Sequence, residues 1–360
     1  MKALQIGDLV ARVPIVQGGM GVGISMSGLA SAVANEGGIG VISAAGLGLV
    51  YKEHSKDFDK ATLWGLKEEI RKAREAARRG IIGVNIMVAM TDFANLVRTA
   101  IASKIDIIFS GAGLPLNLPS YLTEGAKTKL VPIVSSARAL KVIAKRWLGE
   151  YNYLPDAVVV EGPKAGGHLG FQREQIEDPA FALETIVPEV VAVARELEQT
   201  HGRRIPVIAG GGIFTGEDIH RITSLGADAV QMGTRFVTTD ECDASAAFKE
   251  AYLNAREEDI RLIQSPVGMP GRAISNHFLE QVEAGLRHPK QCPFHCIKTC
   301  KVQESPYCIM TALFNAFRGR LEAGYAFCGS NAWRCDRITS VRELIETLKA
   351  EYRKAVGTTE

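Results

Sequence analysis

The stretch IPVIAGGGIFTGEDIHRITSLGADAVQMGTRFV, residues 205–237, contains two short apolar runs that each lead into glycine. Between them, residues 218–225 place apolar side chains at three- and four-residue spacing, as in a helix. A strand, a helix and a second strand in this order are typical of the repeating unit of a parallel sheet. The stretch therefore predicts adjacent parallel strands whose carboxyl ends carry glycine-rich loops.

The same alternation extends back to the N-terminus. Eight apolar runs of strand length occur, at residues 14–20, 39–43, 81–87, 105–111, 130–136, 157–162, 205–212 and 228–237. Helical patterns lie between them, at residues 27–35, 66–79, 92–103, 137–148, 181–199 and 218–225. Eight Val- and Ile-rich strands that alternate with helices predict an α/β fold, a (β/α)8 TIM barrel.

A doubly wound open sheet is the alternative fold. Such a sheet usually has fewer strands and carries its phosphate loop after the first strand. Here the best phosphate loop, AGGGI at residues 209–213, follows the seventh run, which favours the barrel.

After the eighth run the alternation stops, and the chain looks helical and irregular. Near its end, Ser340 stands three residues before Glu343 and opens an amphipathic pattern, which predicts a capped helix that returns to the barrel wall. We therefore expect three units: a barrel over residues 1–240, a smaller helical cap over 241–335 and a C-terminal helix within 336–360.

Composition limits the partners. Charged residues make up 23% of the 360 residues and leave a formal net charge of +2, so no field of one sign is available to hold nucleic acid or an anionic membrane. The N-terminus lacks a signal-peptide pattern, and no stretch approaches the roughly 18 apolar residues of a membrane span. We expect a cytoplasmic protein and leave a homodimer open.

The glycine-rich ends of the last two runs predict an anion site. Two segments, AGGGI (209–213) and MGTRF (232–236), offer backbone N–H groups, and a helix opens at Thr215 beneath the first. A phosphorylated substrate or the phosphate of FMN would fit such a cradle. Its expected members are Gly210, Gly211, Gly212, Gly233 and Thr234.

The other strand ends favour the flavin. QGGMG, residues 17–21, offers bare backbone and a soft methionine side chain against which a flat ring can lie. An amide and a hydroxyl follow at the ends of the third and fifth runs, where they can meet polar atoms of the ring. The expected ring contacts are Gly18, Gly19, Met20, Gly21, Asn85 and Ser135.

The sixth run leads into EGPKAGGHLG, residues 161–170. A buried strand that ends in so flexible a loop can deliver the imidazole of His168 to a bound ligand. Near neutral pH an imidazole can accept a proton or hydrogen-bond an anionic group. A histidine with a purely structural role is the alternative.

Five segments in this order, QGGMG, GVNIMV, EGPKAGGHLG, IPVIAGGGI and QMGTRFV, resemble the nitronate monooxygenase family, formerly called 2-nitropropane dioxygenases. The similarity runs from about residue 10 to 240 and continues through SPVGMPGRAI. It implies an FMN-containing TIM barrel with a smaller helical domain over the flavin. It also implies that a catalytic His168 faces the isoalloxazine, with Glu161, Ala165, Gly166 and Gly167 in the same flavin-binding loop.

The resemblance leaves two activities open. In the first, an alkyl nitronate is oxidised with O2 to a carbonyl compound and nitrite, without nicotinamide. In the second, which resembles the flavin-dependent enoyl-acyl-carrier-protein reductases, NAD(P)H reduces FMN and an enoyl thioester accepts the hydride. Glu161 directly before Gly162 favours the reductase, whereas the overall similarity favours the nitronate reaction. A non-catalytic flavin-binding protein is a third alternative.

Four of the seven cysteines lie close together in the expected cap. Cys292, Cys296, Cys300 and Cys308 are spaced compactly enough to suggest an iron–sulfur cluster or zinc. If residues 292–300 formed one helix, however, its end cysteines would lie about 12 Å apart, which is too far for a single zinc ion. Buried free thiols are the other interpretation.

Overall fold

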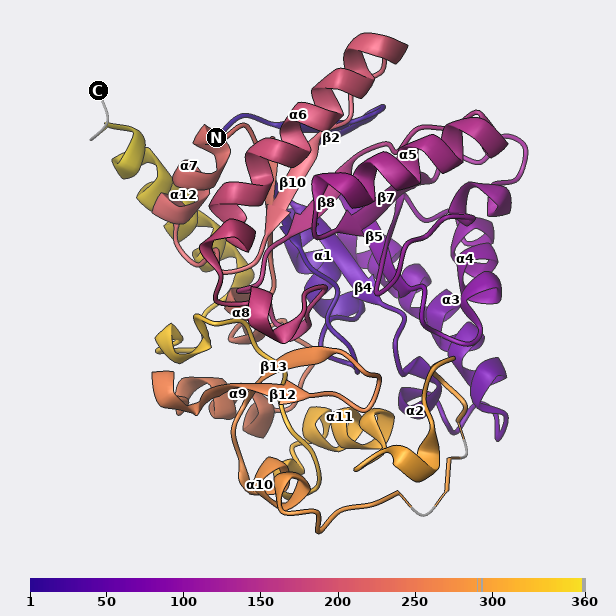
Figure 1. Cartoon of the computed structure of the whole chain (residues 1–360), viewed down its shortest axis with the longest axis vertical. Helices are drawn as coiled ribbons and strands as arrows, with labels where there is room; N and C mark the ends of the chain where they lie inside the picture. The colour runs from indigo at the N-terminus through magenta and orange to yellow at the C-terminus, as the bar shows by residue number, and fades with distance from the viewer. Residues whose placement is uncertain (290, 293, 358–360) are drawn as a thin grey trace.

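A computed structural model describes residues 1–289, 291–292 and 294–357 of the chain. Eight parallel strands form a closed barrel surrounded by helices (Figure 1). The barrel strands are β3 (Ile15–Gln17), β4 (Ile39–Ser43), β5 (Ile81–Met87), β6 (Ile107–Gly111), β7 (Lys129–Val134), β8 (Val158–Glu161), β10 (Val207–Gly210) and β11 (Ala229–Met232). Each predicted run overlaps one of them, so the TIM barrel is confirmed and the open sheet is wrong.

The barrel helices agree with the predicted helical patterns except at their ends. They are α1 (Ser27–Asn35), α3 (Phe58–Ala77), α4 (Phe93–Ala102), α5 (Ala137–Tyr151), α6 (Leu183–His201) and α7 (Gly216–Ser224). The short α2 (Leu47–Val50) follows β4, and the short α8 (Thr234–Val237) follows β11. Helix α3 begins earlier than predicted because the Asp57 carboxylate accepts hydrogen bonds from the N–H groups of Asp59 and Lys60.

The barrel interior is filled at the end where the strands begin. Strands β1 (Leu4–Ile6) and β2 (Leu9–Ala11) form an antiparallel hairpin, and the buried side chains of Leu4 and Ile6 join the core inside the barrel. Phe109 fills the neighbouring space, where a Cβ on Gly83 would lie only 2.7 Å from its ring. Because this end is closed, a ligand has access only from the carboxyl ends of the strands.

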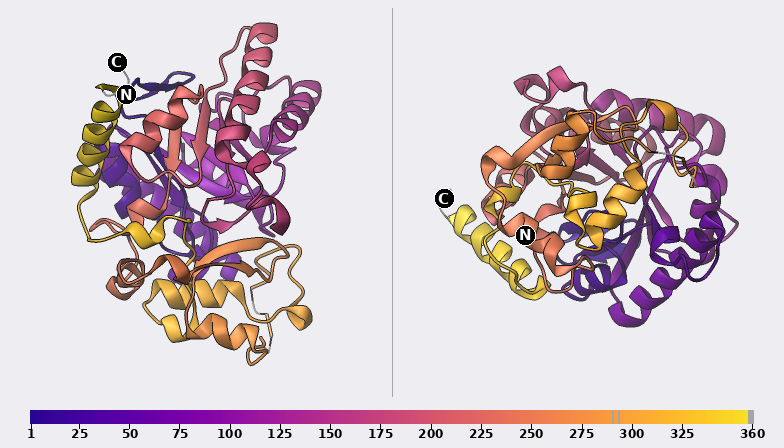
Figure 2. Two further views of the ribbon diagram at one scale, coloured as in Figure 1. Left: turned by 60° about the vertical axis from the view of Figure 1, so that its left-hand side comes forward. Right: turned by 90° about the horizontal axis from the view of Figure 1, so that it is seen from below.

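The cap lies across those carboxyl ends (Figures 1 and 2). It contains the helices α9 (Ala246–Leu253), α10 (His277–Glu283) and α11 (Ile309–Phe317). It also contains a hairpin that the sequence did not predict, β12 (Ile260–Gln264) paired with β13 (Pro270–Ile274). The turn and second strand are rich in glycine and proline, a composition more typical of loops, which hid the hairpin.

The C-terminal helix α12 (Val341–Gly357) packs along α7 of the barrel wall. Its predicted cap is confirmed, since the Ser340 hydroxyl accepts a hydrogen bond of 3.1 Å from the N–H of Glu343. Residues 358–360 of the expected C-terminal unit lie outside the described residues, and the boundaries at residues 240 and 335 stay predictions. Among the described residues, no helix is long and apolar enough to span a membrane.

Candidate active site

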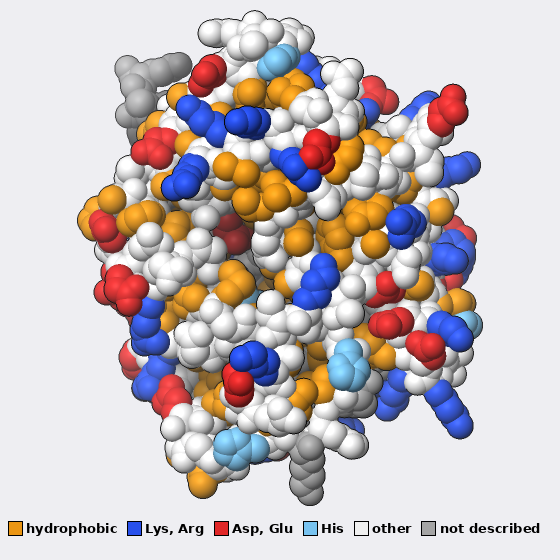
Figure 3. Space-filling view, turned by 45° about the vertical axis from the view of Figure 1, so that its right-hand side comes forward, with side chains coloured by type: hydrophobic (Ala, Val, Ile, Leu, Met, Phe, Trp, Pro, Cys, Tyr) orange, Lys and Arg blue, Asp and Glu red, His pale blue; other side chains and the backbone are white. Residues whose placement is uncertain are grey.

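The predicted site residues outside the cysteine segment lie together at the carboxyl end of the barrel, under the cap. The surface is hollowed between barrel and cap (Figure 3). The loop after β3 carries Gly18, Gly19, Met20 and Gly21, β5 contains Asn85, and Ser135 follows β7. Strand β8 ends at Glu161 and is followed by Ala165, Gly166, Gly167 and His168. Strand β10 ends at Gly210 and is followed by Gly211 and Gly212, and β11 is followed by Gly233 and Thr234.

The loop after β10 has a backbone that only glycine adopts easily. Gly211 has φ +105° and Gly212 has φ +79°, and a Cβ on Gly211 would lie 2.9 Å from the carbonyl oxygen of Gly162. Among the described residues, no acceptor faces the N–H of either glycine. The loop therefore presents two free donors to the barrel mouth.

The helix beneath this loop does not take part as predicted. The carboxylate of Asp218 accepts hydrogen bonds from the N–H groups of Phe214 and Thr215, at 2.9 and 3.0 Å. The carboxylate of Glu351, on α12, accepts one from Gly216 at 2.7 Å. Because carboxylates already occupy the N-terminus of α7, that part of the predicted cradle is wrong.

Three polar side chains at the mouth have no hydrogen-bond partner among the described residues: Asn85, Glu161 and Gln231. The sequence analysis missed Gln231. Its side chain packs against two glycines of neighbouring strand ends: a Cβ added to Gly18 would lie 3.2 Å from its Cγ, and a Cβ added to Gly210 would lie 3.3 Å from its Cβ. Its only sequence signal is a polar residue inside an apolar run. Unpaired polar groups in such a site point to a bound ligand.

Burial raises the pKa of the Glu161 carboxyl to about 7. Among the described residues, no cation offsets this desolvation. Near neutral pH this carboxyl can therefore hold a proton or release it.

Met20 and Ser135, two of the predicted contacts of the flavin ring, lie in different surroundings from each other. The Met20 side chain lies over the backbone after β11, with its sulfur 3.3 Å from where a Cβ on Gly233 would be. Ser135 is already engaged, since its hydroxyl donates a 3.0 Å hydrogen bond to the carbonyl of Gly170. Ser135 therefore supports the loop that carries His168.

His168 is held by the cap. Residues Gly167–His168 form strand β9, which pairs antiparallel with β13 and adds a third strand to the cap hairpin. The imidazole Nε2 lies 2.7 Å from the Oγ of Ser265, and the ring contacts the edge of Phe327 at a centroid distance of 5.0 Å. Burial lowers the pKa of His168 to about 4, so the imidazole is neutral near neutral pH.

Arg272 fixes the same loop, and the sequence analysis did not single it out. Its guanidinium is buried, with 8% of the residue exposed, and it donates 2.7 Å hydrogen bonds to the carbonyls of Pro163 and Ala165. A cation this buried is costly unless its donors are paired. The only sequence signal was its place in SPVGMPGRAI, residues 265–274.

The four clustered cysteines do not lie on a helix. Their segment runs beside the loop after β5, where Ile297 pairs with Met90 and Thr91 donates to the carbonyl of Cys296 at 3.1 Å. All four thiols are free. Burial raises the pKa of the Cys296 thiol to about 12, and the nearby thiols of Cys308, Cys292 and Cys300 add to this shift. In the described part of the chain, no group of His, Cys, Asp and Glu is arranged to hold a metal ion.

Comparison with known proteins agrees with this architecture. The model of a family described as nitronate monooxygenase matches residues 4–351. A probable nitronate monooxygenase of Staphylococcus aureus (strain Newman) is 28% identical over 290 residues, which are 75% of this chain and 77% of the relative.

Two solved structures are similar over nearly the whole chain. FabK from Thermotoga maritima superimposes with a TM-score of 0.73 and 28% identity, covering 96% of this chain and 94% of that one. A nitroalkane oxidase from Streptomyces ansochromogenes has the same TM-score at 22% identity, covering 97% and 98%, and shows the shared fold.

Proposed function

Because the chain belongs to the nitronate monooxygenase family and is therefore an oxidoreductase, we propose that it binds FMN at the barrel mouth and oxidises alkyl nitronates. The co-substrate is O2, and the products are a carbonyl compound and nitrite. Family membership speaks against the alternative of a non-catalytic flavin-binding protein.

The residues at the mouth fit FMN. The free N–H groups of Gly211 and Gly212 suit its phosphate, because no side chain holds the anion away. The unpaired amides of Asn85 and Gln231 can meet the carbonyl and N–H groups of the ring, and Met20 offers it an apolar surface. When bound, the flavin supplies the electron-accepting centre, and the protein supplies binding and orientation.

The setting of His168 favours a nitronate as substrate, because the imidazole is bonded to Ser265 and burial lowers its pKa to about 4. A nitronate has already lost its proton, so it needs a hydrogen-bond donor rather than a base. A neutral imidazole has one N–H to donate, and it is available to the substrate at Nδ1 when the Ser265 hydroxyl donates to Nε2. A base with a pKa of about 4 would remove a proton from a neutral nitroalkane inefficiently near pH 7, because catalysis is best when the two values match.

Glu161 favours a second candidate, an NAD(P)H-dependent enoyl-acyl-carrier-protein reductase. Reduction of an enoyl thioester requires a proton in addition to the hydride. A carboxyl group with a pKa of about 7 is partly protonated near neutral pH and could deliver that proton.

One pair of assays separates the candidates. The purified protein is mixed either with a preformed alkyl nitronate and O2 or with NAD(P)H and crotonyl thioester. We expect nitrite and O2 consumption in the first assay and slow flavin bleaching in the second. Rapid bleaching that the thioester reverses, with no nitrite from any nitronate, would establish the reductase instead. A protein that cannot be loaded with FMN would refute both.

The absorption spectrum of the same protein also tests the cysteine segment. An iron–sulfur cluster on Cys292, Cys296, Cys300 and Cys308 would add a broad shoulder to the flavin bands. The described arrangement of these residues does not favour it, and we expect free thiols. A cytoplasmic location, a homodimer and the absence of nucleic-acid partners stay predictions.

A further inference from the structure

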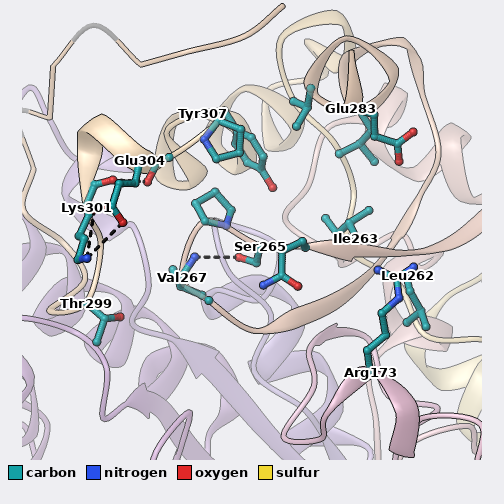
Figure 4. Close-up of a pocket in the computed structure, with 17 residues that line it drawn as sticks. Arg173, Leu262, Ile263, Ser265, Val267, Glu283, Thr299, Lys301, Glu304 and Tyr307 are labelled. Carbon is teal, nitrogen blue, oxygen red and sulfur yellow. Dashed lines mark hydrogen bonds and ion pairs between the residues drawn. The ribbon is translucent and has the colours of Figure 1, made fainter. Parts of the chain in front are cut away.

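The cap contains a cavity of about 650 Å³ beside the β12–β13 turn (Figure 4). Its walls come from the hairpin, from α10 and from residues 299–307. About half of the lining residues are apolar, among them Leu262, Val267, Leu279, Val282, Pro306 and Tyr307. A cavity of this size can take a chain of a small-molecule ligand.

The charges at the cavity do not favour an ionic ligand. Lys301 is paired with Glu304, with its Nζ 3.2 Å from both carboxylate oxygens (Figure 4). The remaining charged groups of the lining, Arg173 and Glu283, have opposite signs. Since the lining carries no excess of either charge, it suits a neutral apolar chain better than a phosphate or a carboxylate.

Ser265 connects this cavity with the candidate active site. It lines the cavity, only 3% of it is exposed, and its Oγ lies 2.7 Å from Nε2 of His168. One side chain therefore contacts both the cavity and the imidazole. A substrate whose reactive head meets His168 has an apolar space within reach of its tail.

We propose that the cavity binds the alkyl chain of the substrate, so that nitronates with longer unbranched chains are preferred to the shortest ones. This proposal rests on the proposed function, because it assigns the substrate class of the same site. Each methylene that enters an apolar cavity favours binding by about threefold to fourfold.

The test measures kcat/KM for unbranched nitronates from two to ten carbons. We expect an increase of about threefold to fourfold for each methylene beyond the third carbon, until the cavity is full. Val282→Trp, which fills the cavity from α10, should abolish the increase with chain length, while its flavin content stays that of the wild type. Val142→Trp is the matched control on the surface of α5, where Val142 is 41% exposed, and should keep it.

A binding measurement keeps this proposal separate from the proposed function. Calorimetric titration with octan-1-ol and propan-1-ol should give at least tenfold tighter binding of octanol to the wild type, and Val282→Trp should remove the difference. If octanol has this advantage but no nitronate is oxidised, the cavity is supported and the proposed function fails. If nitronates are oxidised without dependence on chain length, or octanol has no advantage, the cavity proposal fails.

Discussion

Two loops at the same end of the barrel are held in different ways. The loop after β10 owes its shape to Gly211 and Gly212, whose positive φ angles and missing side chains expose two N–H groups. The loop after β8 is positioned from the cap: Ser265 bonds His168 from 97 residues away in the sequence, and Arg272 bonds Ala165 from 107 residues away.

The comparison shows that flavin binding and the placement of the imidazole depend on different parts of the chain. The N–H donors of the anion cradle depend on the glycine backbone of the barrel, and the cap adds one hydrogen bond of 2.7 Å, from the Asn331 amide to the carbonyl of Gly212. The imidazole depends on a second unit that must fold onto the barrel. Substitutions in the glycine loop after β10 should therefore remove the flavin, whereas substitutions that loosen the loop after β8 should lower turnover and leave the flavin bound.

The largest effect is expected for Gly211→Leu, which changes the glycine loop after β10. Leucine disfavours φ +105°, and its side chain would meet the backbone of Gly162. We expect the flavin-to-protein ratio to fall more than tenfold, and Gly211→Ala to show the same trend if leucine prevents folding. Gly149→Leu, where nothing lies within 4 Å of the added Cβ, is the control. Full flavin content in both Gly211 variants would place the phosphate elsewhere.

His168→Ala removes the group that the cap positions. We expect kcat/KM for preformed nitronates to fall about 10–100-fold, the cost of losing a hydrogen bond to a charged group. Flavin content should not change. His277→Ala, in the exposed part of α10, should match the wild type. Equal rates in the wild type and His168→Ala would make the histidine purely structural.

Arg272→Met tests the comparison most directly, because the residue touches the imidazole loop and not the glycine loop. Loss of both hydrogen bonds to Pro163 and Ala165 should speed amide hydrogen exchange in residues 163–170, and turnover should fall about tenfold. Exchange in residues 209–213 should stay unchanged. Arg261→Met, at an exposed position of the same hairpin, is the control. Equal acceleration in both loops would show that the cap supports them alike.

Glu161→Gln tests the desolvated carboxyl at the boundary of the two loops. Its folded-state pKa of about 7 lies above the ordinary value, so the folded protein binds the extra proton and its stability declines as pH rises towards 7. The flavin-free wild type should lose about 2–5 °C of melting temperature between pH 5 and 8, and the variant should lose less. Parallel pH profiles for the two proteins would mean that the carboxyl is solvated.

The smallest effect is expected far from both loops. Ser340→Ala removes the hydroxyl that caps α12, which costs about 1 kcal/mol. The melting temperature should fall by about 1–3 °C, while flavin content and turnover stay constant. Ser340→Asn should restore stability. A loss of flavin in Ser340→Ala would show that α12 and its Glu351 support the glycine loop more closely than the comparison assumes.

Several features of the site could not be predicted because they depend on distant residues. The N-terminus of α7 looked free in the sequence, yet Glu351 on α12 accepts one of its hydrogen bonds from 135 residues away. The cap hairpin was hidden by glycine and proline, and with it Ser265 and Arg272. Gln231 was overlooked because its neighbours in the sequence are apolar.

The sequence by itself determined the barrel, because strands buried on both faces must be continuous apolar runs. It also indicated the glycine loop, because backbone with positive φ angles and uncovered N–H groups favours glycine. It also located His168 at the end of a strand. Only the tertiary structure decided that this imidazole is neutral and held by a serine. Desolvation and hydrogen bonding depend on which segments fold over a residue, and the segment over His168 comes from a different part of the chain.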